Sequence, residues 1–265
     1  MSSLQAIILG FVQGLTEFLP ISSSGHLVLV NYYLGWGKSL PLHVDIATNT
    51  GTLLAVIVFL RRDVYFAVTG FFSGLKSPRG RTQEGWALAI RVLLASIPTI
   101  FLGLGLREVF EQLNSPIPVS FALIITGLFL WFTPCSGSKT KVGNLTIFDV
   151  VFTGVAQGLA VIPGISRSGI TISALLSRGA SNELAPRFSF MMYLVISLGV
   201  AVLGLFDLPK EIRLGSLTLM TLTSFVTGYI ALYCLFAVLR RGKFRWFAPY
   251  LWLLATFTLL WNFLS

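Results

Sequence analysis

Six stretches of this chain are apolar and long enough to cross a lipid bilayer, and they take up much of its 265 residues. A helix that spans the hydrocarbon core needs about 17 to 25 predominantly apolar residues. Only 11% of the residues are charged, against roughly 25% in soluble domains. The sequence therefore excludes an ordinary soluble enzyme and predicts an all-α polytopic membrane protein with one membrane domain, residues 1–265. The six predicted spans are residues 43–60, 86–106, 117–133, 188–206, 215–239 and 246–264.

The net charge of +9 would favour nucleic acid as a partner if the basic residues formed one solvated face. Thirteen of the 19 Lys and Arg residues fall instead in four short regions between apolar runs. Basic residues concentrate in the cytoplasmic loops of membrane proteins, so we expect these regions to be cytoplasmic. The expected surroundings are the lipid bilayer, with no nucleic acid partner. The four regions are residues 61–81, 139–141, 178–187 and 240–245.

The chain contains an internal duplication at an offset of 144 residues. Gly10–Gly25 aligns with Gly154–Gly169 without a gap, and eight of the sixteen positions are identical, where chance predicts about one. We interpret this as two repeats, residues 1–134 and 145–265.

The aligned segments are apolar helices interrupted by polar residues and proline. Gln13 and Glu17 interrupt the first segment before Pro20, and Pro163 breaks the second. Such breaks are tolerated at membrane depth only where they face protein or water, and paired breaks in two repeats mark a binding site. Each repeat is therefore predicted to contain one re-entrant helical hairpin plus three transmembrane helices. This odd number of crossings inverts the second repeat, and both hairpin tips should meet. Hairpins that cross fully would give the same charge distribution, so only the prolines and polar residues favour re-entrance.

Ionisable side chains inside an apolar segment are expensive to bury and usually functional. Glu17 lies one helical turn after Gln13, and their oxygens suit a divalent cation such as Mg²⁺ or Ca²⁺. A structural ion pair between Glu17 and Arg167 is the competing interpretation. His26 follows three serines and is a candidate nucleophile or general acid, although a packing role is the alternative.

The second tip combines group types that hold phosphate oxygens. Residues 163–171 contain a glycine-rich backbone, three hydroxyl groups and the guanidinium of Arg167. A cation site next to a phosphate site predicts phosphoryl chemistry. The spacings Gly10-xxx-Gly14 and Gly154-xxx-Gly158 are expected to serve close helix packing, because the glycine-rich nucleotide motifs require a preceding strand.

These two motifs together resemble the undecaprenyl-diphosphate phosphatase family of the bacitracin-resistance type. The resemblance rests on residues 13–20, 22–26 and 163–171 and covers essentially the whole chain. It implies a bacterial inner-membrane enzyme that removes the terminal phosphate of undecaprenyl diphosphate, recycling the lipid carrier for cell-wall polymer synthesis. It also implies interdigitated inverted repeats and a site that opens toward the periplasm. Bacitracin would compete indirectly by sequestering the substrate, and a homodimer is an expected assembly.

The resemblance also assigns roles to individual residues. It implies that Gln13 and Glu17 engage the divalent cation, with Glu17 assisting catalysis, and that Ser23 and His26 contact or attack the diphosphate. The residues alone do not choose between Ser23 and His26. Residues 191–195 are bulkier than the family pattern leads us to expect, which should reshape the lipid path without touching the chemistry. The implied substrate-binding residues are Arg167, Ser166, Thr171, Ser22 and Ser24.

Two other functions fit parts of the pattern. An inverted-repeat transporter or flippase for a polyprenyl phosphate lipid could hold the headgroup with the same Glu17 and Arg167. Another class of membrane lipid phosphatase also uses a Ser-Gly-His element, but it requires a second histidine paired with aspartate. His43 and Asp45 have the wrong position and spacing for that role.

Overall fold

The computed structural model describes residues 2–36, 42–135, 137–206 and 214–264, and these ranges are almost entirely helical. The only β-type pairing within them is an isolated bridge between Lys139 and Ala180. The predicted all-α class is therefore confirmed. The α-helices are α1 (Ser3–Phe18), α2 (Ser23–Tyr33), α3 (Leu42–Phe59), α4 (Arg61–Lys76), α5 (Glu84–Gly105), α6 (Arg107–Leu113), α7 (Pro116–Phe132), α8 (Ile147–Leu159), α9 (Arg167–Ser177), α10 (Leu184–Phe206), α11 (Leu214–Arg240) and α12 (Phe247–Leu264), with short 3₁₀ turns at Gly80–Thr82, Val142–Asn144 and Phe244–Trp246.

Four helical segments of the described chain are long and apolar enough to cross a membrane. They lie at Glu84–Gly105, Leu184–Gly204, Gly215–Arg240 and Phe244–Leu264, where four of the six spans were predicted. The other two predicted spans form shorter apolar helices, His43–Phe59 and Pro116–Phe132. Several long apolar helices in one chain identify a multi-pass membrane protein.

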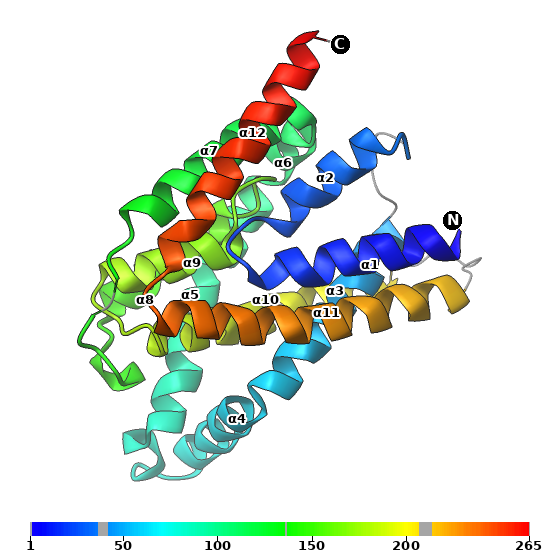
Figure 1. Ribbon diagram of the computed structural model, residues 1–265. Helices are drawn as coiled ribbons and strands as arrows, with labels where there is room; N and C mark the ends of the chain where they lie inside the picture. The colour runs from blue at the N-terminus through cyan, green and yellow to red at the C-terminus, as the bar shows by residue number, and fades with distance from the viewer. Residues whose placement is uncertain (1, 37–41, 136, 207–213, 265) are drawn as a thin grey trace.

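The two interrupted segments each fold as a pair of short helices joined by a tight connection, α1 with α2 and α8 with α9 (Figure 1). Ser22 caps α2 by accepting from the Gly25 amide at 3.3 Å, and Ser166 caps α9 by accepting from the Gly169 amide at 3.1 Å. The two tips touch, because Ser168 Oγ donates to the Leu19 carbonyl at 3.2 Å. The predicted meeting of the tips is therefore confirmed.

Each hairpin packs closely against a long helix through its glycines. A Cβ at Gly14 would overlap the Ser224 carbonyl of α11, and one at Gly10 would press on the Met220 carbonyl. On the second hairpin, a Cβ at Gly154 would overlap the Ala95 carbonyl of α5, where Gly158 also packs. Small residues allow this approach of helix backbones, so the close-packing role of both Gly-xxx-Gly spacings is confirmed.

The base of the second hairpin is fastened by a buried carboxylate. Asp149 Oδ2 accepts from Lys139 Nζ at 2.5 Å, and Asp149 Oδ1 accepts from Arg178 Nε at 2.7 Å. Asp149 also forms a capping box with Thr146 at the start of α8. The carboxylate thus ties both ends of the hairpin to the segment before it, which holds the tip in position.

Two helices occupy regions that the sequence analysis treated as loops. Helix α4 begins directly after α3 and packs on α5, with Gly70 against Gly85 and Gly74 against the Trp86 ring. Helix α6 lies between the predicted spans 86–106 and 117–133, whereas residues 207–213, between the predicted spans 188–206 and 215–239, are outside the described ranges. Both helices are short and begin with charged residues, so neither forms an apolar run long enough to be predicted as a span.

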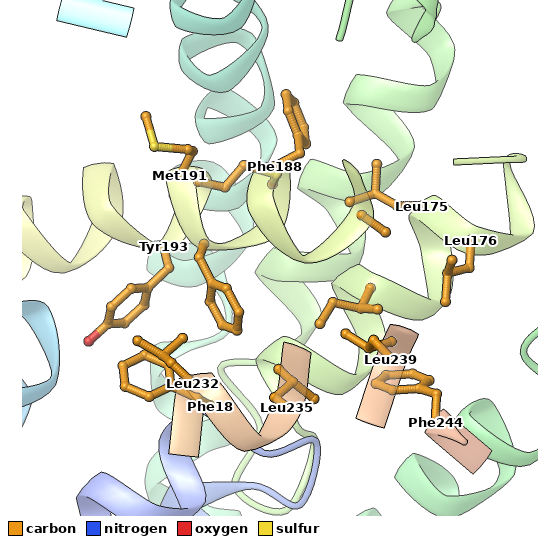
Figure 2. Packing of buried hydrophobic residues seen from close by; sticks show 14 of the residues in the cluster. Phe18, Leu175, Leu176, Phe188, Met191, Tyr193, Leu232, Leu235, Leu239 and Phe244 are labelled. Atoms are coloured by element: carbon orange, nitrogen blue, oxygen red, sulfur yellow. The ribbon is translucent and has the colours of Figure 1, made fainter. Parts of the chain in front are cut away.

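The main hydrophobic core lies directly next to the hairpin tips. The Phe18 ring at the end of α1 meets the Tyr193 ring of α10 edge-on, with centroids 5.9 Å apart (Figure 2). Leu232 and Leu235 of α11 extend this cluster. Since Phe18 is 1% exposed, the last turn of α1 is held rigidly at the boundary between core and tips.

Candidate active site

An ion pair joins the two hairpin tips. Glu17 projects from the last turn of α1, Arg167 is the first residue of α9, and Arg167 Nη2 bonds Glu17 Oε1. The Glu17 side chain is 4% exposed and that of Arg167 is 25% exposed. A carboxylate buried this deeply requires a charged or hydrogen-bonding partner, and the opposite hairpin supplies it.

The second oxygen of Glu17 is occupied by groups from its own hairpin. Ser23 Oγ donates to Glu17 Oε2, and Gln13 Nε2 donates to the same oxygen at 2.9 Å. Gln13 Nε2 is also 3.2 Å from Asn49 Oδ1 on α3. Three predicted site residues, Glu17, Ser23 and Arg167, therefore lie in direct contact, with Gln13 beside them.

Helix α10 contributes residues that the sequence analysis did not assign to the site. The Arg167 guanidinium carbon lies 4.0 Å from the centroid of the Tyr193 ring, and Arg167 Nη1 is 3.4 Å from Ser197 Oγ. The Tyr193 hydroxyl is 2.9 Å from Thr52 Oγ1. Tyr193 belongs to the bulky stretch 191–195, so this stretch contacts a predicted substrate-binding residue. The unusual bulk of residues 191–195 was the sequence feature that could have pointed to Tyr193.

His26 lies at the first tip, where its ring contacts groups outside the ion pair. Its Nδ1 lies 2.8 Å from the Ser22 carbonyl, which can only accept, so Nδ1 carries a proton. Its Nε2 lies 2.7 Å from the Tyr250 hydroxyl, and the two rings stack with centroids 5.7 Å apart. Within the described part of the chain, no hydrogen bond links His26 to Glu17 or Arg167.

The remaining predicted substrate-binding hydroxyls are engaged within the tips. Ser22 and Ser166 cap their helices, and Ser24 lies 3.3 Å from Ser22 Oγ. Thr171 donates to the Arg167 carbonyl at 2.7 Å and contacts Ser189 Oγ at 2.6 Å. These bonds shape the tips around Arg167. A direct contact of these hydroxyls with substrate stays a prediction.

The donor set around Glu17 suits a cation only in part. Among the described residues no group of three or more His, Cys, Asp or Glu side chains could hold a metal ion. Glu17 is the one carboxylate at the tips, and Gln13 turns its amide nitrogen rather than its oxygen toward it. Mg²⁺ commonly binds one or two carboxylates plus substrate phosphates. The residues therefore fit a cation that shares its ligands with a phosphate substrate, not one held by protein alone.

The space beside the ion pair is closed. The crevice there has no room for a water molecule. A phosphate group therefore does not fit into this crevice while the side chains hold these positions. The crevice is lined by Glu17, Phe18, Arg167, Ser168, Ser189, Phe190 and Tyr193.

Comparison with known proteins gives matches along nearly the whole chain. The family model described as bacitracin resistance protein BacA matches residues 6–257. An undecaprenyl-diphosphatase of Acaryochloris marina is 62% identical over 261 residues, which cover 98% of each chain. Undecaprenyl-diphosphatases of Moorella thermoacetica, 41% identical with 96% of each chain covered, and Carboxydothermus hydrogenoformans, 39% identical with 96% of this chain and 95% of the relative covered, are also similar.

Proposed function

Since the chain belongs to the bacitracin resistance protein BacA family, it is a membrane hydrolase of undecaprenyl diphosphate, and we propose that the junction of Glu17 and Arg167 is its active site. The products are undecaprenyl phosphate and inorganic phosphate, and the lipid product is the carrier used in cell-wall polymer synthesis. The observation that carries the site assignment is the contact of Glu17 with both Ser23 and Arg167. The alternative, a transporter for a polyprenyl phosphate lipid, is not favoured, because the similar proteins are named as diphosphatases.

Substrate binding begins with an exchange of partners at Arg167. A diphosphate carries more charge than one carboxylate and accepts two parallel N–H bonds from the guanidinium fork. The Tyr193 ring supports the guanidinium from the side during this exchange. Arg167 then holds the terminal phosphate, and Glu17 is released from its ion pair.

Ser23 is the proposed nucleophile. Its hydroxyl donates to Glu17, the nucleophile–base contact that activates a serine, whereas both ring nitrogens of His26 are engaged by other groups. Ser23 Oγ attacks the terminal phosphorus as Glu17 accepts the hydroxyl proton. The anhydride P–O bond breaks, and Glu17 passes the proton to the departing undecaprenyl phosphate.

The second step restores the serine. A water molecule enters where the lipid phosphate stood, and Glu17 removes one of its protons as the oxygen attacks the phosphoserine phosphorus. The bond between Ser23 Oγ and phosphorus breaks, the serine regains a proton from Glu17, and inorganic phosphate leaves. Positioning and charge neutralisation supply most of the acceleration in phosphoryl transfer. His26 keeps the Ser22–Ser23 backbone in place through its bond to the Ser22 carbonyl.

Glu17 is the proposed protein ligand for a divalent cation, Mg²⁺ or Ca²⁺, with Gln13 as a second ligand after its amide turns. The cation supplies charge neutralisation on the diphosphate oxygens. The donor set supports this proposal because one carboxylate suits a cation shared with substrate phosphates.

The proposed architecture is two inverted, interdigitated repeats. It is supported by the packing of α1 on α11 of the other repeat and, equivalently, of α8 on α5. With the basic loops in the cytoplasm, α8 and α9 enter the bacterial inner membrane from the inside and α1 and α2 from the periplasm, where the site opens. Bacitracin competition through substrate sequestration and a homodimer stay predictions.

Phosphate release from undecaprenyl diphosphate by purified protein in detergent tests this proposal, because detergent has no second compartment. We expect chelator-sensitive release by wild type and by Ser120→Ala, whose hydroxyl donates to the Pro116 carbonyl of its own helix. Ser23→Ala should lose release. Equal release by Ser23→Ala and wild type would overturn the nucleophile, and no release by folded wild type would favour the transporter.

A further inference from the structure

A second cavity, separate from the hairpin tips, lies where four helix termini meet on the basic side of the protein. It has a volume of about 410 Å³ and is formed by the end of α3, the start of α4, the start of α10 and the end of α11. Its position at the charged ends of apolar helices places it at the boundary between the hydrocarbon core and water. None of its lining residues belongs to the proposed active site.

The cavity carries an excess of positive charge. Four arginines and two acidic residues line it, and Arg187 lies 3.7 Å from Asp63 and 4.0 Å from Glu183. Both acidic residues are therefore next to the same arginine. Within the described ranges, the other three arginines have no acidic partner. These are Arg61, Arg62 and Arg240.

Exposed aromatic residues of α11 form another part of the cavity lining. Tyr233 is 70% exposed and Tyr229 is 39% exposed, both on α11. The Phe59 ring packs against Tyr229 and Phe236, with centroids 5.7 and 5.1 Å apart, which gives this part of the lining a fixed shape. A molecule in this cavity therefore meets both guanidinium groups and an aromatic surface.

We propose that this cavity binds the headgroup of an anionic phospholipid from the leaflet on the basic side. Arg61, Arg62 and Arg240 would hold the phosphate, and Tyr229 and Tyr233 would contact the glycerol and upper acyl chain. Basic pockets between transmembrane helices on the cytoplasmic side are suited to anionic lipid headgroups. Guanidinium forks bind phosphate oxygens in pairs, and the cavity volume suits a headgroup-sized ligand.

Lipid adducts counted by native mass spectrometry of the purified protein test the site. The protein is titrated in detergent with dioleoyl phosphatidylglycerol or dioleoyl phosphatidylcholine. We expect wild type to retain phosphatidylglycerol at least about tenfold more tightly. Equal affinity for the two lipids would overturn the proposal, because the arginines would then not recognise the headgroup. Displacement of the lipid by millimolar inorganic phosphate would also overturn it, since the site would then take free phosphate.

Two triple variants distinguish binding by the cavity arginines from binding by basic residues elsewhere on the surface. Arg61→Gln, Arg62→Gln and Arg240→Gln combined should remove the tenfold preference. Lys76→Gln, Arg79→Gln and Arg245→Gln combined remove the same charge from exposed residues on the same side and should keep it. An equal loss in both triple variants would contradict the proposal.

A third variant leaves all charges in place. Ala237 lines the cavity, so Ala237→Phe fills it and should also abolish the preference. Retained binding in this variant would show that the lipid sits elsewhere. Phosphate release in detergent reports folding of all variants and should match wild type, because these residues are outside the active site.

Discussion

The Arg167 guanidinium and the Glu17 carboxylate form an ion pair between two hairpins whose paired residues are 150 positions apart in the sequence. Because Glu17 is almost completely buried, Arg167 is the group that balances its charge before substrate arrives. In the proposed mechanism, a diphosphate that binds Arg167 would free Glu17 at the same moment. The ion pair would then couple substrate binding to the release of Glu17, the proposed base that contacts Ser23.

Replacing Glu17 with glutamine removes the base while keeping the side-chain shape. A carboxamide does not take the proton from Ser23, so Glu17→Gln should lower kcat by about 10²- to 10⁴-fold, measured as phosphate release in detergent. Asp45→Asn is the matched control, since it neutralises another carboxylate in an apolar helix and should not change the rate. Wild-type activity in Glu17→Gln would show that Glu17 only pairs with Arg167.

Replacing Arg167 with lysine keeps the charge but removes the planar fork. Lysine cannot bind two phosphate oxygens in parallel or stack on Tyr193 in the same way. Arg167→Lys should therefore lower kcat/KM by about 10²-fold. Arg79→Lys, at an exposed position, should match wild type. If both variants were fully active, the phosphate-clamp role of Arg167 would be wrong.

The covalent intermediate distinguishes Ser23 from His26. Phosphoserine survives acid, whereas phosphohistidine hydrolyses in acid. Protein quenched in acid during turnover of terminally labelled substrate should therefore retain label in wild type and in His26→Asn, but not in Ser23→Ala. We expect His26→Asn to be slower than wild type, because the bond to the Ser22 carbonyl positions the tip. Label that is acid-labile and lost only in His26→Asn would make His26 the nucleophile.

The sequence predicted the two charged site residues because an ionisable side chain stands out in an apolar run. It did not predict Asn49 or Tyr193, whose types are ordinary in a membrane helix and whose place at the site depends on how α3 and α10 pack on α1. It named Ser22 and Ser166 as substrate ligands, and that role stays a prediction. Their hydroxyls cap helices, and a serine before a helix has the same pattern in either role.

The fold, too, was predicted from the sequence only in part. Long apolar runs marked the spans, and the duplicated glycines marked the close contacts of α1 and α8. Helix α4 was not predicted, because its stability comes from the contact of Gly70 and Gly74 with α5 rather than from an apolar run. The residue pattern of α4 alone does not show that α5 packs against it.

Packing of the first hairpin should fail when Gly14 is enlarged. A side chain at Gly14 would overlap the Ser224 carbonyl, so Gly14→Leu should destabilise the protein by at least about 2 kcal/mol and lower its unfolding temperature in detergent. Gly199→Leu is the matched control, since Gly199 is also in an apolar helix and nothing lies within 4 Å of its Cβ position. Equal unfolding temperatures for the two variants would contradict close packing of α1 on α11.

The role of Tyr193 is separable into its ring and its hydroxyl. The ring lies against the Arg167 guanidinium, whereas the hydroxyl lies 2.9 Å from Thr52 Oγ1 on α3. Tyr193→Leu should therefore raise KM for undecaprenyl diphosphate by about tenfold, the size of a partly buried cation–π contact, and Tyr193→Phe should leave KM near wild type. Tyr65→Leu, at an exposed tyrosine on α4, controls for loss of an aromatic ring. If Tyr193→Phe were as impaired as Tyr193→Leu, the contact with Thr52 rather than the stacked ring would position Arg167.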